Sequence, residues 1–128
     1  MKIRSDEHIA PKIIASLKAL AFRGEIDISS VLDEKLGLRG SSDVHWITEF
    51  ARSGGTAILT ADTDFLKTPP QVDAVFRTGV KVIHLPNRWA QSKLSLQAAH
   101  LLIWWGRIEK KIIDMKPREC FSPKWNVS

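Results

Sequence analysis

The chain contains little cysteine and no long apolar run. Cys120 is the only cysteine, which excludes an intramolecular disulfide and a zinc site built from cysteines. No apolar segment approaches the ~20 residues that a membrane span needs. The first ten residues, MKIRSDEHIA, lack the apolar core of a signal peptide. From these absences we expect a cytoplasmic protein in a reducing compartment, with no membrane partner.

Internal repeats and low-complexity segments are also absent from the sequence. Its 128 residues are 44% hydrophobic, which is enough to form a core and argues against disorder. This length is typical of one domain. We therefore expect a single domain over residues 1–128, with a core over about 1–115 and a C-terminal tail or edge strand over 116–128.

Positive charge is concentrated toward the C-terminal end. Residues 88–128 contain eight lysines and arginines but three acidic residues, an excess that accounts for the whole net charge of +5. A basic region of this kind favours a polyanionic partner such as nucleic acid. A solvated helix face followed by a soluble tail would carry the same charges.

Apolar spacing and turn residues divide the chain into alternating strands and helices. We expect strands over residues 2–5, 25–32, 56–60 and 80–85. We expect helices from Pro11 to a stop at Gly24, from a cap at Ser41 or Ser42 to Gly54-Gly55, over about 68–77, and over about 92–115. This order is typical of an α/β fold, with a parallel sheet covered by helices on both faces. Ligands of such folds bind outside the carboxyl ends of the strands.

Four aspartates fall at one edge of the expected sheet. Asp6 directly follows the first strand, Asp62 and Asp64 follow the third, and Asp43 lies in the region between the second strand and its helix. Like charges repel at short range, so a carboxylate cluster needs a reason. A divalent cation is the simplest one, because Mg²⁺ and Mn²⁺ take oxygen ligands. A metal held there activates water and neutralises a phosphodiester.

A structural interpretation of these acids remains open from spacing alone. Asp43 and Asp6 are both suited to cap a helix or to interact with its dipole. Two aspartates separated by one residue, as at Asp62 and Asp64, also occur by chance in many loops. Only the joint placement of the four acids favours a metal site.

Three segments in sequence order carry a family resemblance. DEHIAP, GLRGSSDVHWITEFARSGG and LTADTDFL resemble the PIN-like nuclease superfamily, and more narrowly the small PIN-like proteins of VapC-type toxins, including the DUF5615-like group. The resemblance covers about residues 1–86, and LTADTDFL is its most specific piece. It implies a single PIN-like α/β domain with a central parallel sheet of about four to five strands flanked by helices.

The same resemblance implies an activity and partners. It implies an endoribonuclease that depends on Mg²⁺ or Mn²⁺ and hydrolyses RNA phosphodiesters, commonly as the toxin of a type II toxin–antitoxin pair. The implied partners are an RNA substrate and a cognate antitoxin, and PIN proteins often form homodimers. The alternative is a non-catalytic PIN-like module that binds RNA or protein. A doubly wound phosphatase is disfavoured because it needs an Asp-x-Asp after the first strand, where this chain has Asp6, Glu7 and His8.

Site residues follow by matching the family motif position by position. Asp6 and Asp62 correspond to the principal metal ligands, and Asp43 and Asp64 complete the catalytic acidic pocket. Thr60 matches a hydroxyl position that can hydrogen-bond the site. Shorter PIN toxins usually have a glutamate where this chain has Asp43, so the shorter side chain here is a departure whose ligation would run through water.

Further candidates adjoin the acids or lie in the basic region. Glu7 and His8 could support the site beside Asp6, although alternation along a strand points Glu7 away. Four basic residues are candidates for binding RNA, with ordinary surface charge as the alternative interpretation: Arg39, Lys67, Lys110 and Lys111. Trp89 and Trp125 are expected to be the more exposed tryptophans, available to a protein interface or to RNA bases.

Overall fold

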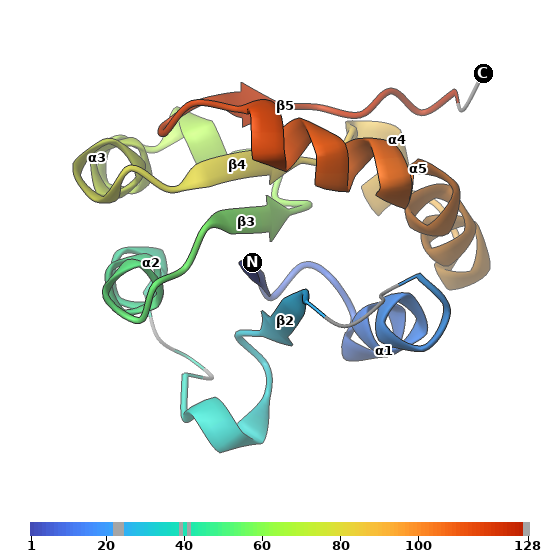
Figure 1. Cartoon of the computed structure of the whole chain (residues 1–128), viewed down its shortest axis with the longest axis horizontal. Coiled ribbons are helices and arrows are strands. Elements are labelled where there is room, and N and C mark those ends of the chain that lie inside the picture. The colour runs from blue at the N-terminus through green and yellow to red at the C-terminus, as the bar shows by residue number, and fades with distance from the viewer. Residues whose placement is uncertain (22–24, 39, 41, 127–128) are drawn as a thin grey trace.

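The computed structural model describes residues 1–21, 25–38, 40 and 42–126. Within these residues, five parallel strands form one sheet in the order β2-β1-β3-β4-β5 (Figure 1). The strands are β1 (Lys2–Ser5), β2 (Asp27–Ser30), β3 (Ala57–Thr60), β4 (Lys81–His84) and β5 (Cys120–Phe121). The helices are α1 (Pro11–Leu20), α2 (Asp43–Arg52), α3 (Pro69–Thr78), α4 (Asn87–Ala90) and α5 (Leu94–Asp114), with short 3-10 turns η1 (Glu34–Leu36) and η2 (Phe65–Lys67). The expected α/β class is confirmed.

Helices cover both faces of the sheet, and alternate strand residues supply the two cores. Figure 1 shows α2 and α3 on one face and α1 and α5 on the other. In β3, Ala57 and Leu59 pack toward α1 and α5, whereas Ile58 packs toward α2 and α3. All three are fully buried, as expected for a parallel sheet with both faces covered. An apolar run without alternation, AILT, therefore predicts this strand correctly.

The bounds of most expected elements are close to those of the structure, but α1 already ends at Leu20 and β2 spans only Asp27–Ser30. One helix was not expected. Ser42 caps α2, because its hydroxyl oxygen accepts the His45 N–H at 3.2 Å. The alternative cap at Ser41 and the expected helix stop at Gly24 lie outside the described residues. The C-terminal segment does contribute an edge strand, β5, which pairs in parallel with β4. The unexpected helix is α4, which begins at Asn87 just after β4.

Trp89 anchors α4 and corrects an expectation from the sequence. Its indole N–H donates to the Gln97 carbonyl oxygen at 3.0 Å, and the Gln97 amide donates back to the Trp89 carbonyl oxygen at 2.9 Å. Trp89 is 0% exposed, so the prediction that it is exposed was wrong. The short helix places this ring between the sheet and α5, which a linear pattern does not reveal. Trp125 is half-buried.

Arg4 is a buried cation in the middle of β1. Its Nη1 donates to Glu49 Oε2 at 2.6 Å and its Nε donates to Ser29 Oγ at 3.2 Å. The guanidinium also lies 4.9 Å from the centre of the Phe50 ring. These contacts tie β1 to α2 and to β2, and they satisfy a charge that would otherwise be costly to bury.

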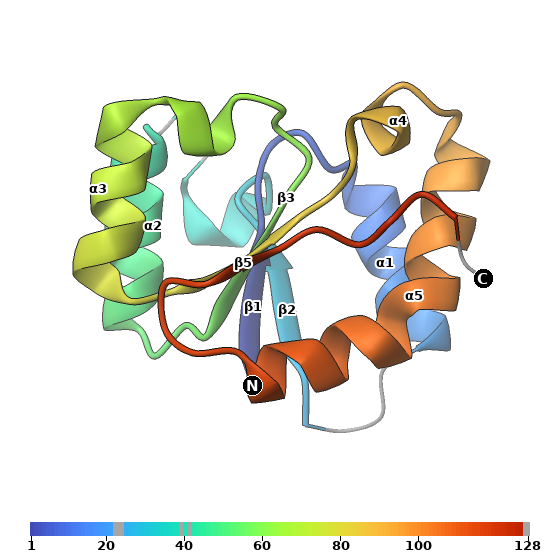
Figure 2. The same cartoon turned by 90° about the horizontal axis from the view of Figure 1, so that it is seen from above.

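The parallel register brings several strand ends to one edge, at the top of Figure 2. Ser5 of β1 is paired with Leu59 of β3, and Thr60 of β3 with His84 of β4. The Asp6 N–H continues the ladder by donating to the Leu59 carbonyl oxygen at 3.0 Å. Residues that follow β1, β3 and β4 therefore meet at this edge. Among the described residues, no helix has the length and apolar character to span a bilayer.

Two glycines allow a matched test of the backbone geometry. Gly79 ends α3 in the left-handed region at φ +77°, and its N–H donates to the Val75 carbonyl oxygen. Gly106 lies inside α5 with open space at its missing Cβ. We expect Gly79→Ala to lower the free energy of unfolding by about 1–2 kcal/mol. We expect Gly106→Ala to raise it by roughly 0.5–1 kcal/mol, because alanine loses less backbone entropy in a helix.

Urea unfolding followed by circular dichroism measures both changes. A Gly79→Ala variant as stable as the original chain would contradict the left-handed end of α3. A destabilised Gly106→Ala variant would contradict the open space beside α5.

Candidate functional site

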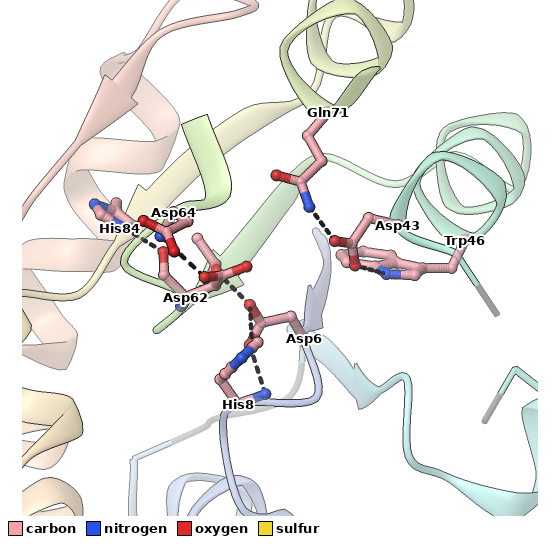
Figure 3. Close-up of polar contacts among 9 residues, drawn as sticks. Asp6, His8, Asp43, Trp46, Asp62, Asp64, Gln71 and His84 are labelled. Carbon is pink, nitrogen blue, oxygen red and sulfur yellow. Dashed lines mark hydrogen bonds and ion pairs between the residues drawn. The ribbon is translucent and has the colours of Figure 1, made fainter. Parts of the chain in front are cut away.

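Asp6 is a buried carboxylate at the end of β1. It is 2% exposed and accepts hydrogen bonds from the Thr60 hydroxyl and from the His8 backbone N–H, the latter at 3.0 Å (Figure 3). The His8 ring Nδ1 lies 3.6 Å from Asp6 Oδ2. Burial raises the pKa of the Asp6 carboxyl above its ordinary value of 3.8, and the contacts with Thr60 and His8 oppose that rise.

Asp62 and Asp64 form a turn that is held at several points. The Asp62 N–H donates to Thr60 Oγ1 at 3.1 Å, and the Asp64 N–H donates to Asp62 Oδ1 at 2.9 Å. The His84 ring Nε2 lies 2.8 Å from the Asp62 carbonyl oxygen. Asp64 is exposed and forms an ion pair with Lys67 at 3.7 Å. The Thr60 hydroxyl therefore connects the carboxylate of Asp6 to the backbone of Asp62.

Asp43 belongs to a separate hydrogen-bond network. It is the first residue of α2, and its Oδ1 accepts the Trp46 indole N–H at 2.9 Å. Its Oδ2 accepts the side-chain amide of Gln71 from α3. Figure 3 shows the hydrogen bonds that join the Asp43 carboxylate to Trp46 and to Gln71. Both carboxylate oxygens thus have a donor within the protein.

The donor set suits a hard divalent cation, but the four acids are not assembled as a cage. In the described ranges, no group of three histidines, cysteines or acids is arranged to hold a metal. Mg²⁺ usually keeps several waters and binds through one or two carboxylates. Asp6 and Asp62 meet that smaller requirement chemically, since Asp6 is a desolvated carboxylate and Asp62 is linked to it through Thr60.

The remaining sequence candidates divide by position. His8 and Lys67 lie beside the acids, and Glu7 is exposed. Lys110 and Lys111 are exposed near the end of α5. That end lies beside the start of β4, because Lys81 Nζ donates to the Ile112 carbonyl oxygen at 2.6 Å, so these lysines are at the opposite edge from the acids. A fourth basic candidate, Arg39, lies outside the described residues.

Two residues that contact the aspartates, His84 and Gln71, were not expected from the sequence. His84 was not among the site residues expected from the sequence, yet it ends β4 at the same edge as Asp62. Its place as the last residue of a strand was the signal that could have identified it. Gln71 gave no comparable signal, because its contact with Asp43 depends on how α2 and α3 pack.

Burial of Asp6 predicts a pH dependence of stability. The folded state holds the Asp6 proton more tightly than the unfolded state, because the folded pKa is raised. The contribution of Asp6 to stability is therefore fully present below the unfolded pKa and is lost as the pH rises through the folded pKa. We expect Asp6→Asn, which removes the buried charge, to raise the free energy of unfolding at pH 7 more than at pH 4.

Urea unfolding at both pH values checks this expectation, with Asp114→Asn on the exposed end of α5 as the matched control. A loss of stability at pH 7 in the Asp6→Asn variant, or an equal change in the control, would contradict it.

Comparison with known proteins agrees with this architecture. A family model described as "PIN like domain" matches residues 1–87. No curated protein and no solved structure gives a significant match. The matched segment contains β1 to β4 and all four aspartates of the site. PIN-like domains have a nuclease-type fold and commonly use divalent metals. The chain belongs to the PIN-like domain family.

Proposed function

We propose that this protein is a metal-dependent endoribonuclease that hydrolyses RNA phosphodiesters with Mg²⁺ or Mn²⁺. The observation that carries the proposal is the Thr60 hydroxyl, which joins the buried Asp6 carboxylate to Asp62 at the ends of two adjacent parallel strands. Membership of the PIN-like family supports the same conclusion. The catalytic acids would be Asp6, Asp43, Asp62 and Asp64.

Asp6 and Asp62 are the residues that would hold the cation. When bound, a divalent cation lowers the pKa of water and neutralises developing phosphodiester charge. Thr60 restricts the Asp6 carboxylate to one orientation, while the Asp64 N–H restricts that of Asp62. His84 holds the turn by its contact with the Asp62 carbonyl oxygen. These bonds preorganise the two carboxylates, which reduces the reorganisation required on binding.

Asp43 would contribute in a different way. Its oxygens accept one hydrogen bond each, from Trp46 and Gln71, and these bonds orient the carboxylate while a second lone pair on each oxygen stays open. We propose that Asp43 acts through water, which suits its short side chain at a position where related toxins carry glutamate.

The hydrogen bonds to Asp43 favour a second candidate function. A carboxylate with two internal donors is satisfied without a metal, as expected in a PIN-like module that binds RNA or protein without cleaving it. The two functions differ in one measurable property. Only the nuclease loses an activity when Asp62 is changed.

Cleavage of a labelled mixed RNA pool tests the nuclease directly. With Mn²⁺ or Mg²⁺ the purified chain should cleave the pool, and EDTA should abolish cleavage. Asp62→Asn should lower the rate by at least about 100-fold, since even outer partners of a metal ligand commonly contribute 10–100-fold. Asp73→Asn, on the exposed surface of α3 and paired with Arg77, is the control that should keep the rate.

RNA binding separates the two outcomes. Absence of cleavage together with salt-sensitive RNA binding would refute the nuclease and favour the non-catalytic module. Absence of both would remove RNA as the ligand of this site.

We further propose that the nuclease is the toxin of a type II toxin–antitoxin pair, restrained by a cognate antitoxin and able to form a homodimer. Induced expression of the chain alone should then arrest bacterial growth, because uncontrolled RNA cleavage stops translation. Asp62→Asn should restore growth at equal protein level, measured by optical density and immunoblot. Growth arrest that persists in the Asp62→Asn strain would show that cleavage is not its cause.

A further inference from the structure

A row of neighbouring rings connects α5 to β5 and to the segment that follows β5. The His100 ring is stacked on Trp125, with centroids 5.1 Å apart and planes 9° apart, and lies 6.2 Å from the Trp104 ring. Trp104 in turn lies 6.4 Å from Phe121. The His100 Nε2 contacts the Lys124 carbonyl oxygen at 2.7 Å, which fixes the C-terminal segment against the helix. We call His100, Trp104, Phe121 and Trp125 the aromatic row.

Three exposed cations lie over rings of the aromatic row. The distances from charge to ring centre are 5.5, 4.6 and 5.3 Å for Arg88 over Trp125, Arg107 over Trp104 and Lys111 over Phe121. Such contacts restrain long side chains that would otherwise move freely. The three positive charges thus lie along the aromatic row on restrained side chains. We call them the row cations.

An arginine whose guanidinium lies over a ring, as that of Arg88 lies over Trp125, can still donate hydrogen bonds to a second partner. The N–H donors of a guanidinium lie in its plane and point outward. Those donors match a phosphate in a bidentate geometry. In the part of the chain that the structure describes, no carboxylate lies within 4.0 Å of Arg88 or Lys111. Their charges therefore remain available to an anion.

The surface along the aromatic row presents the charges of the row cations to a partner more than it presents apolar area. Trp104 is only 8% exposed, so its ring is not accessible for stacking on a base. Residues 88–128 also carry the whole excess of positive charge in the chain. A partner with repeated negative charges fits this surface better than an apolar protein face. A single nucleic-acid strand has that property at every nucleotide.

The row cations begin near the acidic site. Arg88 lies in α4, which follows the carboxyl end of β4 and is therefore at the edge that carries Asp6 and Asp62. Lys111 lies near the other end of α5, beside the start of β4. Figure 2 shows α4, α5 and the segment after β5 side by side along this path. A strand bound here would lead toward the aspartates.

We propose that the row cations form a phosphate-binding track for single-stranded RNA. The track leads to the sheet edge that carries Asp6 and Asp62, which we call the acidic edge. The track is a second contact surface, built from residues beyond the segment that matches the PIN-like family. Its delivery of RNA to the aspartates rests on the proposed nuclease function. Its binding of RNA does not depend on that function.

Fluorescence anisotropy of a labelled 20-nucleotide RNA in EDTA measures binding without cleavage. The test variant combines Arg88→Gln, Arg107→Gln and Lys111→Gln. The matched control removes three exposed cations elsewhere: Lys12→Gln, Lys18→Gln and Arg52→Gln. We expect the test variant to bind at least about 10-fold more weakly, and its slope of log affinity against log salt to fall by about 2, since each lost single-strand phosphate contact removes about 0.7. The control should keep affinity and slope nearly unchanged.

A charge-preserving variant tests whether weaker binding comes from the lost donors rather than from misfolding. Arg88→Lys with Arg107→Lys keeps both charges but loses the planar donors, so its salt slope should stay near that of the original chain while affinity falls. Equal weakening of the test variant and the matched control would overturn the track, because it would show a general charge effect. Failure of the original chain to bind RNA, with binding of an acidic protein instead, would also overturn it.

Substrate length separates failure of the track from failure of the nuclease. A trinucleotide reaches only the aspartates, so the test variant should cleave it at the original rate while cleaving the 20-nucleotide RNA more slowly. If no RNA is cleaved but the test variant still loses binding, the nuclease fails and the track stands. If both RNAs are cleaved equally well and bound equally well, the track fails and the nuclease stands.

Discussion

The hydroxyl of Thr60 is the contact on which the acidic edge depends. It donates to the Asp6 carboxylate and accepts the Asp62 N–H, so it joins the ends of β1 and β3. A carboxylate as deeply buried as Asp6 is costly unless it is hydrogen-bonded. The parallel register supplies the necessary partner, because it places Thr60 one residue beyond the strand pair of Ser5 and Leu59. Burial then leaves the Asp6 carboxyl with a pKa above its ordinary value.

The aspartates of the acidic edge fall into two groups that differ in their hydrogen-bond partners. The Asp62 carboxylate accepts the Asp64 N–H, His84 contacts the Asp62 carbonyl oxygen, and the exposed Asp64 forms an ion pair with Lys67. Asp43 is held instead by Trp46 and Gln71, which satisfy it within the protein. The difference arises because Asp6, Asp62 and Asp64 follow strands, whereas Asp43 begins a helix that packs on another helix. Any reaction at this edge has to accommodate that asymmetry.

The two segments of the chain differ in the charged groups that they contribute. The segment that matches the PIN-like family carries all four aspartates, and it is electrically neutral as a whole. The remaining residues carry the excess positive charge and arrange part of it over the aromatic row. Trp89 and Gln97 both belong to this second segment, where their reciprocal hydrogen bonds fix α4 on α5.

Local pattern by itself predicted β1 to β4 and the four longer helices along the chain, and it placed the acids after strands or at a helix start. AILT predicts a buried strand, Pro11 and Ser42 predict helix starts, and Asp6 and Asp62 follow from the parallel arrangement of the strands. Tertiary structure alone decided which side chains meet across long separations. The contact of Asp43 with its partner on α3 spans 28 positions, and that of His100 with the C-terminal segment spans 24. Burial of Trp89 was likewise decided by packing. Periodicity records which face of an element is apolar, but not which distant side chain lies opposite it.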